Sequence, residues 1–137
     1  MTAIIDYDAG NLRSVEKAIA LLGGDPVITR DRETILKADH VILPGVELGD
    51  AMEKLNQYGL TEVVREVAQA GIPLIGICLG MQLLFERSDE SDGVPGIGVL
   101  EGDIIKIPDT PGLKIPPHGL GNSLGYPPRG TRLYEGD

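Results

Sequence analysis

The chain has 137 residues and a formal net charge of −9, from 21 acidic and 12 basic side chains. Because phosphate backbones and anionic lipids attract positive charge, this balance argues against nucleic acid and membrane surfaces as partners. The single cysteine excludes an internal disulfide framework, and no apolar run approaches the roughly 20 residues that cross a bilayer. The first residues do not resemble a signal peptide, so we expect a cytoplasmic protein.

Strands and helices are predicted to alternate over the first 86 residues. Short apolar runs predict buried strands at residues 3–7, 27–29, 41–43 and 73–77. Apolar periodicity and capping residues predict helices after Asn11, from Asp31 through Lys37, at 50–57, from Thr61 to Gly71, and at 79–86. Continuous apolar strands separated by helices are typical of a parallel sheet covered on both faces. The sequence therefore predicts a doubly wound, mostly parallel α/β fold of the flavodoxin-like type, with strand order 2-1-3-4.

The composition changes after Glu86. A polar loop is followed by residues 99–107 (VLEGDIIKI), whose alternation predicts a strand or hairpin. From Pro108 to Gly130, eleven of the 23 residues are proline or glycine, and such a segment forms little regular structure. We therefore expect an α/β domain over residues 1–107 and an irregular tail over residues 108–137.

The most informative segment is Gly76-Ile77-Cys78-Leu79-Gly80, between a predicted strand and a predicted helix. It has the form of the G-x-S-x-G nucleophile elbow, with sulfur in place of oxygen. The glycines let the chain turn sharply and hold Cys78 at a helix N-terminus, where a thiolate is favoured. The amide of Leu79 is placed to donate to an oxyanion. A lone cysteine is more often a small buried apolar residue, but this context favours a nucleophile.

A cysteine nucleophile needs a base, and the chain has only two histidines. His40 opens a predicted strand at the edge opposite the elbow, so we expect a partly buried structural role. His118 lies in the segment rich in proline and glycine, where no sequence argument holds it beside the elbow. The turn at residues 44–46 (PGV) is a candidate for the second oxyanion N–H, although an ordinary turn is equally compatible. Asp6 and Asp8 are spaced to hold Mg²⁺, but capping a loop is the favoured role.

Three segments carry a family resemblance: IIDYDAGNLRSVEKA, ILPGVELGDAM and PLIGICLGMQLLFERSDE. They resemble signature segments of the class I glutamine amidotransferases that serve as glutaminase subunits of imidazole glycerol phosphate synthases. The segments GVLEGDIIKIP and KIPPHGLGNSL match more weakly, and the resemblance extends from residue 1 to about residue 124. It implies hydrolysis of glutamine to glutamate and ammonia, and transfer of the ammonia to a (β/α)₈-barrel cyclase subunit, as a heterodimer acting in histidine biosynthesis.

The resemblance also implies roles for individual residues. Cys78 resembles the nucleophile, and Leu79 and Val46 resemble the donors of the oxyanion hole. Gly45 and Gln82 resemble residues of the substrate-binding part of the site. Gly45 and Val46 also match a segment whose peptide reorients when the cyclase is engaged. The family chemistry implies neither a metal nor a cofactor.

Departures from the family pattern bear on activity. Glu47 replaces a glycine beside the oxyanion segment, which restricts the backbone and adds negative charge where negative charge must develop. Asp8 also stands where the first loop usually has a glycine. The family's catalytic histidine and glutamate belong to a C-terminal third that would follow Asp137. We therefore expect a truncated member that does not turn over glutamine by itself.

Two other readings use the same kind of sheet. One is a non-catalytic flavodoxin-like binding module; its receiver-like form needs an acceptor aspartate after the third strand, where this chain has Leu43-Pro44-Gly45. The other is a cysteine hydrolase or chaperone of the DJ-1 type, which also places a cysteine on an elbow. That type lacks the LPGV and CLGMQ context, and esterase or deglycase activity without a cofactor would reveal it.

Overall fold

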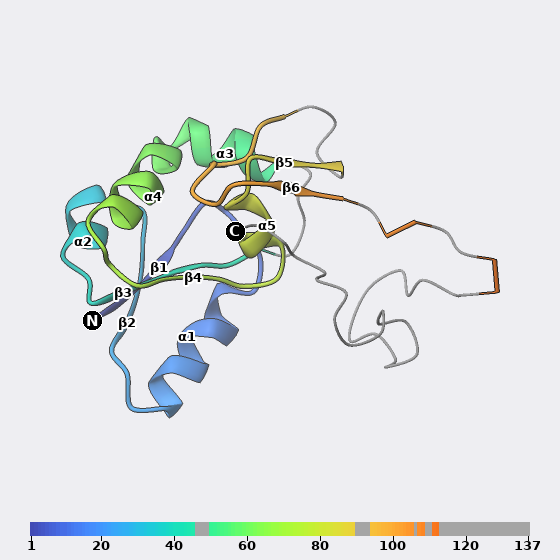
Figure 1. Ribbon diagram of the computed structural model, residues 1–137. Helices are drawn as coiled ribbons and strands as arrows, with labels where there is room; N and C mark the ends of the chain where they lie inside the picture. Colours follow the sequence, from blue (N-terminus) through green and yellow to red (C-terminus); the bar gives the residue numbers. More distant parts are fainter. Residues whose placement is uncertain (46–49, 90–93, 106, 109–110, 113–137) are drawn as a thin grey trace.

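The computed structural model describes residues 1–45, 50–89, 94–105, 107–108 and 111–112. Within these residues, a parallel sheet has the strand order β2-β1-β3-β4 (Figure 1). Its strands are β1 (Thr2–Ile5), β2 (Pro26–Thr29), β3 (His40–Leu43) and β4 (Leu74–Gly76). The helices are α1 (Leu12–Leu21), α2 (Arg32–Leu36), α3 (Ala51–Gln57), α4 (Leu60–Gln69) and α5 (Leu79–Leu83). The predicted α/β class and strand order are confirmed.

The order of the strands places a switch point at β1. The chain runs from β1 to β2 on one side and then returns to pair β3 with the other side of β1. Because all these pairs are parallel, the carboxyl ends of the strands meet at one edge of the sheet. The residues that leave β1, β3 and β4 therefore come together there, and they include Tyr7, Pro44 and Cys78.

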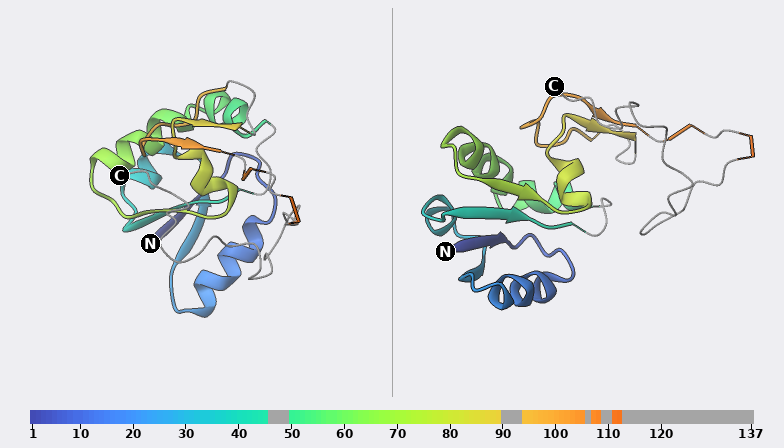
Figure 2. Two further views of the ribbon diagram at one scale, coloured as in Figure 1. Left: turned by 45° about the vertical axis from the view of Figure 1, so that its right-hand side comes forward. Right: turned by 60° about the horizontal axis from the view of Figure 1, so that its bottom comes forward.

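One face of the sheet carries the main hydrophobic core. Ala3, Ile5, Val41 and Leu43 alternate toward this face and pack in one cluster with residues of α2, α3 and α4. Figure 2 shows these three helices on the same side of the sheet. The fully buried residues that α2, α3 and α4 contribute to this cluster are Ile35, Leu55, Leu60, Val64 and Val67. Every second strand residue points to this face, and these side chains pack against the apolar faces of the helices in one layer.

The opposite face carries a row of isoleucines in register across the strands, Ile28, Ile4, Ile42 and Ile75. Helix α1 lies on this face and contacts β1 and β2 (Figure 2). The exposed fraction is 0% at Ile4 and 6% at Ile42, but it reaches 52% at Ile75. Among the described residues, β4 is therefore the least covered strand on this face.

Two local predictions are wrong. The strand or hairpin predicted at 99–107 is limited to β6 (Asp103–Ile104), which pairs with β5 (Arg87–Ser88) in parallel, and a parallel pair cannot form a hairpin. Thr61 does not cap a helix, because α4 begins one residue earlier, after Gly59 in a left-handed conformation (φ 68°). The Thr61 hydroxyl is part-buried and donates to Asn56 Oδ1 at 2.8 Å.

Most of the predicted tail, residues 113–137, lies outside the described residues, so the domain boundary after residue 107 stays a prediction. In the part of the chain that the structure describes, no helix is both long and apolar enough to span a membrane.

The layered core leads to a first prediction. Leu55 on α3 is 0% exposed, and Leu55→Ala should lower the free energy of unfolding by about 2–5 kcal/mol, because the side chain leaves a cavity in the core. Leu22, at the end of α1, is 87% exposed, and Leu22→Ala should change it by less than about 0.5 kcal/mol. Urea denaturation of both variants checks this. Equal effects would contradict the placement of the core.

Candidate active site

Cys78 lies on the turn between β4 and α5, at the carboxyl edge of the sheet. Its backbone has φ 56° and ψ −121°, a conformation that residues with a side chain rarely adopt. The side chain is exposed, and the cysteine is free. The predicted sharp turn from strand to helix is therefore present, and it presents a thiol to solvent rather than burying it.

Three glycines make room for this turn. A methyl group on Gly80 would lie 2.0 Å from the carbonyl oxygen of Leu43, and one on Gly76 would lie 2.5 Å from the Cα atom of Met81. On the neighbouring strand end, a methyl group on Gly45 would lie 2.5 Å from the amide nitrogen of Gly80. Side-chain carbons essentially never approach other atoms this closely, so the contact between the ends of β3, β4 and α5 requires glycine at these positions.

The elbow offers an amide for an incoming oxyanion. The amides of Gly80 and Met81 already donate to backbone carbonyls, at 2.9 and 3.0 Å. The Leu79 amide has no acceptor among the residues that the structure describes, as expected for the first turn of a helix. Gly45, from the second predicted donor segment, is buried beside Gly80. Val46, the other predicted donor, lies outside the described residues.

Gln82 lies on α5, the helix that begins directly after Cys78. Its Oε1 atom is buried and has no hydrogen-bond partner among the described residues. A buried amide oxygen without a donor is unfavourable, and such atoms normally find a partner. This free acceptor is compatible with the substrate-binding role that the family resemblance implies for Gln82.

No described histidine stands at the elbow. His40 is the first residue of β3 and pairs with Thr2, at the edge of the sheet opposite Cys78. It is exposed rather than partly buried, which corrects the prediction of a structural histidine. His118 lies outside the described residues. The structure thus brings together the predicted nucleophile, Cys78, and one predicted oxyanion donor, Leu79, but the described residues supply no histidine beside them.

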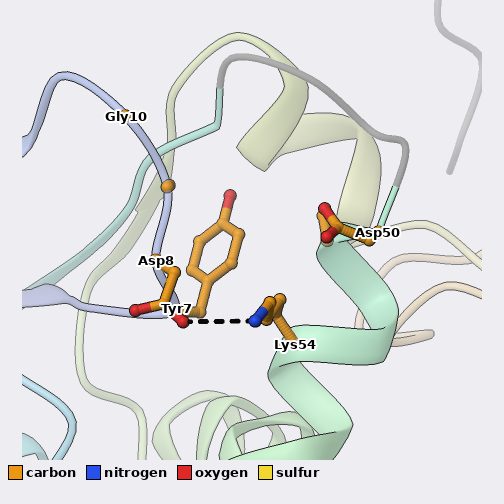
Figure 3. A pocket seen from close by; sticks show the side chains of 7 residues that line it. Tyr7, Asp8, Gly10, Asp50 and Lys54 are labelled. Atoms are coloured by element: carbon orange, nitrogen blue, oxygen red, sulfur yellow. Dashed lines mark ion pairs between the residues drawn. The ribbon is translucent and has the colours of Figure 1, made fainter.

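A second group of polar residues surrounds a hollow of about 320 Å³ beside the first strand (Figure 3). The hollow is lined by residues from the end of β1 and the start of α3: Tyr7, Asp8, Ala9, Gly10, Asp50, Ala51 and Lys54. Figure 3 shows the Asp8 carboxylate facing Lys54 across it, with 3.5 Å between Asp8 Oδ2 and Lys54 Nζ. Tyr7 stands between the two elements.

Asp8 is held by further contacts from β2 and α3. Tyr58 donates to its Oδ2 atom at 2.5 Å, and Arg30 binds its Oδ1 atom at 3.1 Å while stacking 4.0 Å from the centre of the Tyr58 ring. The hydrogen bond from Tyr58, followed by the contacts of Arg30 and Lys54, lowers the pKa of Asp8. Asp6 accepts from the Asp8 amide at 3.2 Å and also pairs with Arg30. The bond from the Asp8 amide to Asp6 is the loop capping predicted for one of these two acids.

Three contacts at this edge could not be predicted from the sequence. The Tyr58 and Arg30 contacts to Asp8 join three elements that are distant in the sequence, and such pairs have no local signal. The Tyr7 hydroxyl donates to the carbonyl of Pro44, across 37 residues. A tyrosine at the end of a buried strand was the one available hint, because a buried hydroxyl usually finds a partner.

The fold and the elbow define an α/β protein with an exposed cysteine on a strained turn at the switch edge of a parallel sheet. Residues 3–109 match the model of the class I glutamine amidotransferases. A solved structure of a glutamine amidotransferase superposes with a TM-score of 0.65 and 25% sequence identity, over 75% of this chain and 55% of the other. The chain belongs to the class I glutamine amidotransferase family.

Three curated relatives of this chain are named as subunits of the same enzyme. The HisH subunit of imidazole glycerol phosphate synthase from Bacillus cereus (strain G9842) is 54% identical over 108 residues, which are 78% of this chain and 52% of the relative. HisH 1 from Methanococcus maripaludis is 51% identical over 112 residues, 78% of this chain and 55% of the relative. HisH from Moorella thermoacetica is 47% identical over 98% of this chain and 62% of the relative. The chain thus spans about half to three fifths of their length.

The glycine contacts lead to a prediction about the elbow. Gly80→Ala should lower the free energy of unfolding by about 1–3 kcal/mol or more, because the added methyl group meets the carbonyl of Leu43. Gly10 has nothing within 4 Å of the same added atom, so Gly10→Ala should stay within about 0.5 kcal/mol of the wild type. Urea denaturation compares the two. Similar values for both variants would show that the close approach at Gly80 does not exist.

The Asp8 contacts lead to a prediction about acid stability. Because the folded pKa of Asp8 lies below the unfolded value of about 3.9, its contribution is present above that value and is lost as the pH falls through the folded pKa. Tyr58→Phe removes the largest cause of the shift. The difference in unfolding free energy between the wild type and this variant should therefore be largest at pH 7 and shrink below about pH 4. Urea titrations from pH 7 to pH 2 measure it, and a difference independent of pH would contradict the assignment.

Proposed function

We propose that this chain carries the nucleophile half of a glutaminase site that serves imidazole glycerol phosphate synthase. The observation that carries the proposal is the strained, exposed Cys78, held on its turn by close glycine contacts at the end of β4. The relatives named HisH are subunits of that synthase, which supports the assignment to histidine biosynthesis. The substrate is then glutamine, and the site uses no metal or cofactor.

The chemistry follows from the residues at the elbow. The Sγ atom of the Cys78 thiolate bonds to the carboxamide carbon of glutamine, and the π electrons of the C=O bond move onto the oxygen. The Leu79 amide stabilises this oxyanion, and the segment at Gly45 and Val46 supplies the second donor. When the electron pair returns, the C–N bond breaks, the nitrogen takes a proton, and ammonia leaves a γ-glutamyl thioester. Water then adds to the thioester carbon, the C–S bond breaks, and glutamate and the thiol are released.

Substrate binding is assigned to Gln82 and Gly45. The unpartnered Oε1 atom of Gln82 is an acceptor on the helix that follows Cys78, and because it is buried, a rotation of the side chain is needed before it accepts from an N–H group of the substrate. Gly45 has no side chain, so its backbone packs directly against the elbow at Leu79 and Gly80 and places the end of β3 beside the bound carboxamide. A bulky residue at Gly45 would displace the elbow itself, whereas a change at Gln82 would act on the binding of glutamine.

The partner is proposed to be a (β/α)₈-barrel cyclase that accepts the ammonia, in a cytoplasmic heterodimer. The relatives are named as subunits, which implies that they have a partner subunit. Their sequences are 45–54% identical to this chain over the matched residues. Proton transfer to the leaving nitrogen needs an imidazole or a similar group near Cys78. The described residues supply none, so this chain by itself should form the thioester slowly and turn over poorly.

Two assays test the proposal. A chloromethyl ketone analogue of glutamine should alkylate Cys78, releasing chloride, and L-glutamine should protect the thiol while D-glutamine should not. Ammonia release from glutamine should stay at background, with or without an added cyclase subunit, because loss of one member of a catalytic triad removes on the order of 10⁴-fold or more of the rate. Cys78→Ser is the control for both.

The two assays have separate outcomes. Alkylation without protection by L-glutamine would rule out a glutamine site at the elbow. Ammonia release that disappears in Cys78→Ser would confirm the nucleophile and show that a base acts within this sequence, contrary to our expectation.

A further inference from the structure

Tyr7 makes a long-range contact next to the elbow. It follows β1, is 3% exposed, and donates its hydroxyl to the carbonyl of Pro44 at the end of β3. Burial raises the pKa of Tyr7 to about 12, so the hydroxyl keeps its proton throughout the physiological range. The contact thus links the ends of the two central strands at the edge where Cys78 lies.

The hydrogen bond from Tyr7 restricts ψ of Pro44, which is the only backbone torsion of this residue that rotates freely. The pyrrolidine ring fixes φ of Pro44 near −65°, so the direction of its carbonyl depends on ψ alone. Because the peptide is planar and trans, a fixed Pro44 carbonyl also fixes the N–H of Gly45 on the opposite side of the same plane. A hydrogen bond to this carbonyl therefore sets the orientation of the whole Pro44–Gly45 peptide.

The same peptide touches the elbow. A methyl group on Gly45 would lie 2.5 Å from the amide nitrogen of Gly80 and 2.9 Å from the carbonyl carbon of Leu79. The carbonyl carbon of Pro44 lies 3.0 Å from the atom that a side chain on Gly80 would add. The Pro44–Gly45 peptide is thus held between Tyr7 on one side and the oxyanion side of the elbow on the other.

We propose that Tyr7 is a positioning residue of the site, which fixes the Pro44–Gly45 peptide and so keeps the backbone beside Leu79 in the orientation that receives the oxyanion. This inference rests on the proposed glutaminase chemistry. Tyr7 does not touch the substrate and takes no part in proton transfer. Its hydroxyl limits the rotation that would turn the peptide away when negative charge develops on the substrate oxygen.

Two reagents separate this role from a purely structural one. Iodoacetamide reacts with the Cys78 thiolate by direct displacement of iodide, and its carbonyl oxygen gains no charge. The thiolate first adds to the carbonyl carbon of the chloromethyl ketone analogue of glutamine, which forms an oxyanion. The sulfur then displaces chloride from the adjacent methylene carbon, the oxyanion re-forms the C=O bond as the sulfur leaves the carbonyl carbon, and a thioether remains. The ratio of the two alkylation rates in the 137-residue chain therefore reports the oxyanion side of the site, independently of the thiol.

Tyr7→Phe removes only the hydroxyl and keeps the buried ring. It should slow the reaction with the chloromethyl ketone about tenfold, less than loss of a whole oxyanion donor, and leave the iodoacetamide rate unchanged. Tyr58→Phe is the matched control, because it removes a hydroxyl that binds Asp8 and not the oxyanion segment. It should leave both rates unchanged.

Each outcome decides the matter. If Tyr7→Phe reacts with each of the two reagents at the same rate as the wild type does, the positioning role is wrong. An equal loss with both reagents, which general loosening or misfolding produces, would overturn it as well. A wild-type chain that reacts with the glutamine analogue no faster than with chloroacetone, a ketone without the amino-acid part, would instead refute the proposed glutamine site, which is a separate result from the effect of Tyr7.

Discussion

The site depends on a backbone contact from which side chains are excluded. Gly45, Gly76 and Gly80 come from the end of β3, the end of β4 and the start of α5, and each would clash with a neighbouring backbone if it carried a Cβ atom. This approach lets α5 begin directly after the strand, with the thiol of Cys78 on the outside of the turn. The unusual backbone of Cys78 is maintained because the surrounding packing leaves no room to relax it.

The remaining polar residues of this edge support that contact from the neighbouring strands. Tyr7 restrains the peptide before Gly45, and the residue after it, Asp8, is fixed by Arg30 and Tyr58. The loop after β1 is therefore anchored both toward β3 and toward α3. Tyr58 acts on the side of this loop that faces α3, and Tyr7 acts on the side that faces the elbow.

The parts of the fold that follow from local pattern were predictable. The positions of the four strands and their order were correct, although only β1 and β3 are buried, while β2 and β4 are partly covered. Asp31 caps α2 as expected, accepting from the Thr34 amide at 3.0 Å. The elbow was recognisable because its glycines are a local requirement of the turn. The start of α4 was missed because Gly59 adopts a left-handed conformation that replaces a side-chain cap.

The parts that depend on distant residues were not predictable. The contact between Tyr7 and Pro44 and the cluster around Asp8 join segments whose spacing carries no periodic signal. The sequence shows that the isoleucines of the row across the sheet are apolar. Which of them are buried depends on the position of α1 over the sheet. Within the described residues α1 covers β1 and β2 rather than β4, and nothing in the sequence of β4 reports this.

The position of β4 has a consequence for how the chain behaves in concentrated solution. Within the described residues, β4 pairs only with β3, so its other side presents backbone N–H and C=O groups in a row, with the half-exposed Ile75 beside them. An open strand edge with an apolar side chain is a template on which another extended segment can add. Whatever occupies that edge, whether more of the same sheet or a second molecule, gains main-chain hydrogen bonds that require no particular sequence. Among the described strands, β4 is thus the edge at which strand addition would also cover a half-exposed apolar side chain, directly before the turn that carries Cys78.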